Sequence, residues 1–292
     1  MLYFDLHCDT LYRATIDNSD FYNSEYHISI SKLPDFQKWH QMFAVWIPDE
    51  IRGIDATNLF IKAIDKFNKL SVNNDKYKMM LAVENASMLN GDIRNIKLLV
   101  DNNVRYVTLT WNGENELGCG AFSNCSYGIS RFGIEVVKQL ESRSVAVDVS
   151  HASDKLFYDV VNIATKPILA THSNSRVITD NKRNLTDDQF KIIRDMGGIV
   201  GLNFYKGFLN NNENDASIDD IVRHAERFLN LDGENTLAIG SDFDGADMPI
   251  GISSISDIPM IFERFCQEFG AKLTKKVFFD NANMYFTNFD NN

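Results

Sequence analysis

Histidines and carboxylates stand directly after several short apolar runs of this 292-residue chain. The first run leads into Asp5-Leu6-His7-Cys8-Asp9, so His7 and Asp9 are two positions apart and point to the same side of an extended chain. Later runs end in the same residue types, namely Glu84, His151, His172, and the pair Asp242 and Asp244. Imidazole and carboxylate groups serve as metal ligands and as proton carriers in hydrolytic sites. The pattern therefore predicts metal-dependent chemistry where these runs end.

A cluster of this many carboxylates requires cations. Like charges held close together disfavour joint ionisation, and a divalent metal removes that conflict. Imidazole nitrogen with carboxylate oxygen suits Zn²⁺, with Mn²⁺, Co²⁺ or Fe²⁺ as alternatives. The candidates exceed the four ligands of one tetrahedral site, so we expect two metal ions with a shared carboxylate. Cys8 points the opposite way from His7 and Asp9, and we do not expect it to be a ligand.

The elements that must position these groups are eight short runs, often β-branched, of the kind that alternate with helices in parallel barrels. They are residues 2–6, 42–47, 79–83, 106–110, 145–149, 167–170, 199–204 and 237–240. Eight such runs predict an α/β fold, a (β/α)8 barrel of TIM type, which builds its active site at the carboxyl ends of the strands. A doubly wound open sheet is the alternative.

Helical periodicity fills the intervals between these runs. The predicted helices cover 56–70, 93–102, 132–142, 154–164, 187–196 and 218–229, and the tail from Pro259 to Phe286 predicts two more. Ser153 and the Thr186-x-x-Gln189 pattern indicate helix starts. The chain shows no linker and no repeat, so we expect residues 1–292 to form a single barrel domain with extra C-terminal helices.

Composition excludes several classes of partner. The chain has 29 Lys and Arg against 40 Asp and Glu, a formal charge of −11, which argues against nucleic acid and anionic membranes as partners. The apolar stretch before Asp5 is too short for a leader or a membrane span, and we expect a cytoplasmic protein. The four cysteines have no repeated spacing and are expected to be reduced. His27, His40 and His224 follow no apolar run and are expected to be structural.

A set of motifs, in order along nearly the whole chain, resembles a known family. They are Asp5-Leu6-His7-Cys8-Asp9-Thr10-Leu11, Ala82-Val83-Glu84-Asn85, Tyr106-Val107-Thr108-Leu109-Thr110, Asp148-Val149-Ser150-His151-Ala152-Ser153, Thr171-His172-Ser173-Asn174, Arg183-Asn184-Leu185 and Gly240-Ser241-Asp242-Phe243-Asp244-Gly245. This set is similar to the renal or membrane dipeptidase family, peptidase family M19, within the metal-dependent amidohydrolase superfamily. Taken together, the motifs are highly specific.

The resemblance implies a dizinc dipeptidase. It implies that His7 and Asp9 hold one zinc, that His151 and His172 hold the other, and that Glu84 bridges them. It further implies that a hydroxide shared by the two metals attacks the peptide carbonyl of a small dipeptide. Tolerance for a C-terminal D-residue is left open. By analogy with the family, the chain could form a homodimer.

The family pattern also assigns two residues outside the ligand set. Arg183 corresponds to the arginine that grips the terminal carboxylate of the dipeptide, and a surface ion pair with Asp187 or Asp188 is its alternative role. Asp242 corresponds to the acid near the shared water and the substrate amino group, where it moves a proton to the leaving amine.

Trp111 departs from the family pattern. The family commonly has a histidine there that polarises the scissile carbonyl, and an indole cannot be protonated to stabilise an oxyanion. Either a metal takes over this role or the substrate differs, and Asn112, Asn115 or a group on another loop is a further candidate for the donor. Trp111 itself is expected to form a wall of the substrate pocket.

Three other functions stay open at this point. The wider superfamily includes hydrolases of cyclic amides, esters and lactones. A metal-free lyase or isomerase would need a reactive lysine at a strand end, and no predicted strand ends in lysine. A binding homologue without turnover is the third, and Trp111 is the feature that suggests it.

Overall fold

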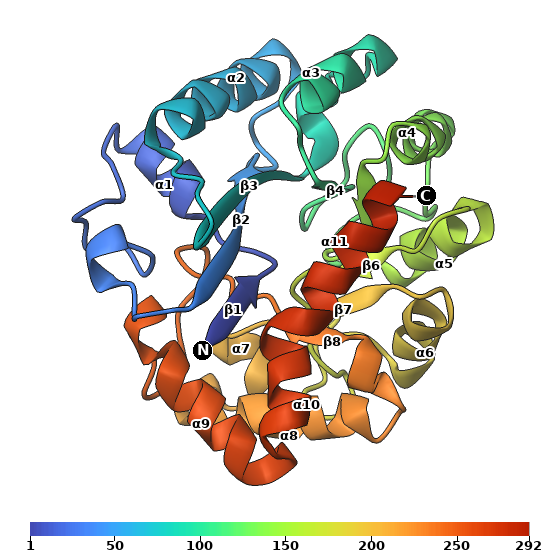
Figure 1. Cartoon of the computed structure of the whole chain (residues 1–292). Helices are drawn as coiled ribbons and strands as arrows, with labels where there is room; N and C mark the ends of the chain where they lie inside the picture. The colour runs from blue at the N-terminus through green and yellow to red at the C-terminus, as the bar shows by residue number, and fades with distance from the viewer. Residues whose placement is uncertain (292) are drawn as a thin grey trace.

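The computed structural model describes residues 1–291, with side chains through residue 290, and its centre is a closed barrel of eight parallel strands (Figure 1). The strands are β1 (Leu2–Asp5), β2 (Lys38–Trp46), β3 (Tyr77–Glu84), β4 (Tyr106–Thr108), β5 (Ala146–Asp148), β6 (Leu169–Ala170), β7 (Ile199–Leu202) and β8 (Leu237–Ile239). Each strand pairs with its neighbours in sequence, and β8 closes the ring on β1. The predicted (β/α)8 barrel is confirmed, and the open doubly wound sheet is wrong.

Helices surround the strands and continue beyond the last one. They are α1 (Thr10–Ile16), α2 (Gly53–Leu70), α3 (Ile96–Asp101), α4 (Arg131–Ser142), α5 (Asp154–Ile163), α6 (Asp187–Asp195), α7 (Lys206–Leu209), α8 (Ile218–Leu229), α9 (Ile258–Phe269), α10 (Ala271–Lys275) and α11 (Asn281–Asn291), with a π-helical turn at Lys276–Asp280. The predicted helices all occur, and the caps at Ser153 and Thr186 form as expected. Two short helices, α1 and α7, were not predicted because seven and four residues are too few to show a period.

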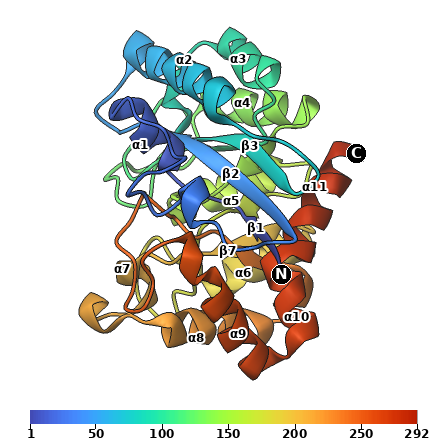
Figure 2. The ribbon, with the colours of Figure 1, turned by 60° about the vertical axis from the view of Figure 1, so that its left-hand side comes forward.

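The inside of the barrel is closed at one end by the C-terminal helix. Phe4, Met42 and Met80 point into the barrel and pack in one cluster with Phe286 and Phe289 of α11. This is the end at which the strands begin, because the Tyr285 hydroxyl of α11 donates at 2.7 Å to Pro167 O, which lies just before β6. Figure 2 shows α11 and the N-terminus at this end, and α7 with long loops at the other. The carboxyl ends of the strands are thus left open for chemistry.

The structure bears on the state of the cysteines and on the expected lack of a membrane span. Cys119 and Cys125 form a disulfide within the loop after β4, so the expectation of four reduced thiols is wrong for this pair, whereas Cys8 and Cys266 are free. The two cysteines are six positions apart, which lets the loop fold back on itself, and spacing alone does not reveal such a local pairing. Within residues 1–291, none of the helices combines the length and the apolar character needed to cross a bilayer.

Candidate active site

The predicted site residues occupy the carboxyl ends of the strands, on loops with unusual backbone geometry. His7 and Asp9 follow β1, Glu84 ends β3, His151 follows β5 and His172 follows β6. His151 has φ 66° and Asp242, after β8, has φ 63°. Non-glycine residues seldom adopt this left-handed conformation, and it concentrates where a side chain must be aimed at a functional site.

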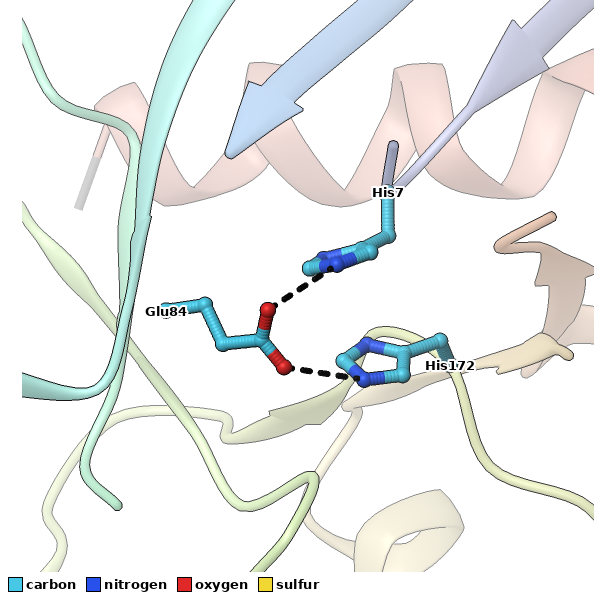
Figure 3. A group of neighbouring side chains, drawn as sticks. All are labelled: His7, Glu84 and His172. Atoms are coloured by element: carbon cyan, nitrogen blue, oxygen red, sulfur yellow. Dashed lines mark ion pairs between the residues drawn. The ribbon is translucent and has the colours of Figure 1, made fainter. Parts of the chain in front are cut away.

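The five predicted ligands converge on one point inside the barrel mouth, and all are buried. Glu84 lies at the centre: its Oε2 is 3.5 Å from His7 Nε2, and its Oε1 is 2.7 Å from His151 Nε2 and 3.6 Å from His172 Nε2. Figure 3 shows the Glu84 carboxylate between the rings of His7 and His172. Asp9 Oδ2 lies 3.5 Å from His7 Nε2. One carboxylate thus faces three imidazoles, as a bridging group would.

A buried tyrosine fixes the proton of His7. The Tyr106 hydroxyl donates to Leu6 O at 2.7 Å, so its oxygen is free to accept from His7 Nδ1 at 3.0 Å. With the proton on Nδ1, the lone pair of His7 Nε2 faces the carboxylates. That Nε2 atom is buried and has no hydrogen-bond partner among the described residues. Metal ligands are commonly oriented through their second ring nitrogen in this way.

His151 and His172 are oriented in the same way, by an oxygen atom that accepts a hydrogen bond from Nδ1. Thr171 Oγ1 donates to Asp148 Oδ2 at 2.7 Å and accepts from His172 Nδ1 at 2.9 Å. His151 Nδ1 donates to Asn112 Oδ1 at 2.9 Å. Both rings therefore turn Nε2 lone pairs toward the centre, where the two Nε2 atoms are only 3.0 Å apart.

Facing lone pairs and carboxylates repel unless a cation lies among them, and this arrangement fits metal ions. Two groups of buried or half-buried donors have atoms within 4.8 Å of one another, His7 with Glu84 and His172, and His7 with Asp9 and Asp242. Asp9 Oδ1, like His7 Nε2, is buried without a hydrogen-bond partner in residues 1–291. The donor set is imidazole and carboxylate throughout, and Cys8 is turned away, with its Sγ donating to Met42 O at 3.4 Å.

The pKa values of two carboxylates and two histidines in the cluster agree with a metal-binding site. Burial, together with the charge of Asp9, raises the pKa of Glu84 to about 7, and burial raises the pKa of Asp242 to about 6. Burial holds the pKa values of His151 and His172 well below their usual range. At His7 burial acts in the same direction, but the charges of Tyr106 and Glu84 outweigh it and raise the pKa. Neutral imidazoles are the ligand form, and the carboxylates need neighbouring positive charge to ionise together.

Asp242 and Arg183, an acid and a base, both lie beside the cluster, but they differ in how other residues hold them. Asp242 Oδ1 lies 4.0 Å from His7 Nε2, while its Oδ2 accepts from Asn203 Nδ2 at 2.9 Å. Arg183 is buried, its guanidinium lies 5.2 Å from the centre of the Phe208 ring, and its Nε has no hydrogen-bond partner among the described residues. Burial lowers the pKa of Arg183 to about 10, which leaves it charged at neutral pH.

The alternative role of Arg183, a surface ion pair, is wrong in this structure. Asp187 pairs with Arg227 and Asp188 accepts from Tyr158. Arg183 makes no ion pair with any residue that the structure describes, although a buried guanidinium is stabilised by an anion. It is therefore a cation available to a ligand.

A cavity of about 740 Å³ opens over the cluster, and Trp111 forms part of its wall as expected. Asn112 also lines it, with its oxygen engaged by His151. Asn115 is excluded as a substitute for the family histidine, because its amide nitrogen donates to Asn85 Oδ1 at 2.8 Å and to Leu109 O at 2.7 Å. Both amide protons of Asn115 are thus used within the loop.

Sequence reasoning missed the long loop after α1, which contributes Glu25, Tyr26 and His27 to the cavity. His27 is tied to the last strand's loop: its N–H donates to Asp244 Oδ1 at 2.7 Å, and its Nδ1 accepts from Asp244 N at 2.9 Å. Tyr106 was also missed as the partner of His7. No signal in the sequence joins residues 217 or 99 positions apart. Its place at the start of a predicted strand marks Tyr106 only as a buried residue.

With this geometry in view, the family can be stated. A family model described as membrane dipeptidase (peptidase family M19) matches residues 71–283. The chain belongs to this family. The resemblance drawn from the motifs is confirmed, and so, at the level of the family, is the assignment to metal-dependent dipeptidase hydrolases.

Individual relatives agree with the family assignment. The chain is 36% identical over 199 residues to an uncharacterized protein in the pqqA 5′ region of Klebsiella pneumoniae, covering 64% of this chain and 73% of that protein. It is 24% identical over 258 residues to dipeptidase 3 of Mus musculus, covering 80% of this chain and 52% of the mouse protein. The match thus spans about half the length of the mouse relative.

A solved structure shows the same fold. A metallo peptidase from Rhodobacter sphaeroides, liganded with a phosphinate mimic of the dipeptide L-Ala-D-Ala, superposes with a TM-score of 0.90 at 21% identity, covering 98% of this chain and 99% of that chain. At this identity the likeness establishes the barrel architecture.

Proposed function

We propose that this protein is a two-zinc dipeptidase that cleaves short substrates with a free C-terminal carboxylate. The observation that supports it most strongly is the set of three Nε2 lone pairs turned toward one carboxylate, each fixed by a hydrogen bond at Nδ1. His7 and Asp9 would hold one ion, His151 and His172 the other, and Glu84 both. When bound, these ions supply Lewis acidity to water and to the scissile carbonyl.

Arg183 orients the substrate in this proposal. Its buried guanidinium donates from Nη2 to His172 O at 3.4 Å but has no ion-pair partner among the described residues, so it can take a carboxylate. It lies close enough to Glu84 and Asp242 for their charges to affect its pKa. A carboxylate bound there places the adjoining amide over the cluster. Because one residue separates the carboxylate from the scissile bond, dipeptides are selected over longer chains.

Asp242 moves the proton. Its raised pKa, about 6, allows it to accept a proton from the attacking water and to return it to the leaving amine near neutral pH. Asn203 holds the other carboxylate oxygen and so fixes the direction in which Asp242 points.

The proposal is tested by elemental analysis of protein purified without chelator, together with detection of free amino acids from a panel of substrates. L,L- and L,D-dipeptides should be hydrolysed, whereas hydantoins and lactones should not, and about two equivalents of Zn²⁺, or of Mn²⁺, Co²⁺ or Fe²⁺, should co-purify. Hydrolysis of lactones in preference to dipeptides, or a protein without transition metal after growth with zinc, would contradict it.

A further inference from the structure

Three aromatic side chains form one continuous face of the cavity, which we call the aromatic wall: Tyr12 of α1, Trp46 at the end of β2 and Trp111 after β4. The ring centres of Tyr12 and Trp46 are 4.7 Å apart, and those of Trp46 and Trp111 are 5.0 Å apart. Trp111 reaches the cluster, with its ring centre 6.1 Å from that of His151. All three rings are half-buried and border the cavity.

The aromatic wall presents an uncharged surface beside a strongly charged centre. Trp46 Nε1 is buried and has no hydrogen-bond partner among the described residues. Asp49, close in sequence to Trp46, accepts from Gly113 N at 2.6 Å and pairs with Arg52 at 3.4 Å, so its charge is already engaged. The exposed parts of these half-buried rings face the cavity, and their burial becomes more complete when an apolar group packs against them.

Arg183 lies across the barrel mouth from this wall. The wall comes from the segments after β1, β2 and β4, whereas Arg183 follows β6, and Tyr205 and Phe208 follow β7. In a closed ring of eight strands, β2 to β4 face β6 to β8. Glu84 ends β3, on the same side as the wall, and its carboxylate reaches to within 3.6 Å of His172, which follows β6.

We infer that the aromatic wall is the subsite for the side chain of the N-terminal residue, and that the enzyme prefers dipeptides whose first residue is bulky and apolar. This inference rests on the proposed function. With the carboxylate on Arg183 and the amide over Glu84, the N-terminal side chain is the part of the substrate that is left to face the wall. A Phe or Leu side chain buries its surface against the three rings, whereas a Glu or Lys side chain placed there loses water and finds no charged group on the wall itself.

The test is kcat/KM of the zinc-loaded enzyme for Phe-Ala, Leu-Ala, Ala-Ala, Glu-Ala and Lys-Ala. We expect Phe-Ala and Leu-Ala to exceed Ala-Ala by roughly 10- to 100-fold, the range in which a few buried methylenes discriminate. Glu-Ala and Lys-Ala should fall below Phe-Ala by at least that factor. Trp46→Ala should reduce the ratio of Phe-Ala to Ala-Ala to within about threefold of unity.

Two further variants make the result decisive. Tyr12→Ala, on a different element, should reduce the same ratio and replaces Trp46→Ala if that variant does not fold. Phe122→Ala is the matched control, because Phe122 is an aromatic residue on the loop after β4, 50% exposed, that does not line the cavity, and it should keep the wild-type ratio.

The outcomes separate the two claims. If none of the dipeptides is hydrolysed, the proposed function itself fails. If they are hydrolysed at similar rates, or if Lys-Ala or Glu-Ala is the best substrate, the wall is not an apolar subsite and only this inference is overturned. The same holds if both wall variants retain the wild-type ratio of Phe-Ala to Ala-Ala.

Discussion

At the scale of single residues, the orientation of the three histidines depends on oxygen atoms that are not themselves ligands. Tyr106, Thr171 and Asn112 each accept the Nδ1 proton of one imidazole. Two of these acceptors are oriented in turn, Tyr106 by Leu6 O and Thr171 by Asp148. Such outer partners set both the tautomer and the basicity of a ligand, so their removal should be felt in metal affinity.

Tyr106→Phe removes the acceptor of His7 Nδ1 while keeping the ring in the core. We expect metal affinity to fall by roughly 10- to 100-fold, because His7 can then place its proton on either nitrogen. Titration of the apoenzyme with Zn²⁺ measures this. Tyr285→Phe is the control, since Tyr285 is also a buried tyrosine but donates to Pro167 O at the closed end of the barrel. Equal zinc affinity in the two variants would refute the role of Tyr106.

Glu84→Gln should lose metal and activity together, because a neutral amide cannot compensate the charge of two cations. Arg183→Ala should keep its metal but bind substrate poorly, with KM raised roughly 100-fold by loss of a charge-assisted, bidentate contact. Metal analysis and steady-state kinetics of both variants distinguish these roles. A full metal complement with normal turnover in Glu84→Gln would exclude it as the bridging group.

Asp242→Asn should slow turnover by roughly 10²- to 10⁴-fold, the usual contribution of a positioned proton carrier, with the fold intact. The amide can still accept from Asn203, so the geometry is expected to persist while proton transfer is lost. Near-UV circular dichroism checks the fold, and kcat checks the rate. An unchanged kcat would remove Asp242 from the reaction.

At the scale of elements, α8 is fixed to its surroundings by a buried histidine far from the cluster. His224 Nδ1 accepts from Ser175 N at 3.0 Å, and its Nε2 donates to Leu209 O at 3.0 Å. Both nitrogens are therefore satisfied in the neutral ring, and protonation would break the bond from Ser175. Burial lowers the pKa of His224 to about 4. The expectation that His224 is structural agrees with these contacts.

This lowered pKa makes stability depend on pH. Between the unfolded pKa, about 6.5, and the folded value, the unfolded chain binds the proton more readily, so the free energy of unfolding falls as pH falls. His224 should contribute up to about 3 kcal/mol to that loss between pH 6.5 and 4. Urea unfolding of the protein and of His224→Gln at several pH values measures the difference. Parallel pH profiles of the two proteins would count against this assignment.

At the scale of the whole molecule, the barrel has one end for chemistry and one end for stability. Phe286 of α11 stacks on Phe4 with ring centres 5.9 Å apart and continues the interior of the barrel. Arg105, just before β4, lies over the Phe286 ring at 5.5 Å and pairs with Asp290. The ligands stand at the opposite ends of the same strands, so packing and catalysis can be separated by mutation.

Phe286→Ala should lower the free energy of unfolding by about 3–5 kcal/mol, the cost of a large cavity in a packed core. Metal content and kcat of the folded variant should stay close to those of the parent, because the change is at the far end of the barrel. Met284→Ala, at a side chain that is 48% exposed on the same helix, is the control and should shift stability by less than about 0.5 kcal/mol. A similar loss in both variants would show that α11 does not plug the barrel.

The local hydrophobic pattern of the sequence was sufficient to predict the eight strands and to identify the candidate ligands. The eight apolar runs became β1–β8, and each candidate ligand stands where its run ends. The short helix α1, the cavity loop with His27, and the Cys119–Cys125 pairing escaped prediction. Each depends on contacts with residues outside the local window, as the Asp244 bonds to His27 and Ile28 show. Neither hydrophobic period nor turn chemistry records such contacts.

The sequence by itself determined a parallel barrel with histidines and carboxylates at the strand ends, because strand period, helix period and the position of a residue after a strand are local properties. Only the tertiary structure decided how these groups face one another. It brought the three Nε2 atoms to Glu84, gave the Nδ1 protons of His7 and His151 to oxygens far along the chain, and left Arg183 buried without an anion. Closure of the ring is the physical reason, since it brings strand ends that are far apart in the chain to one mouth.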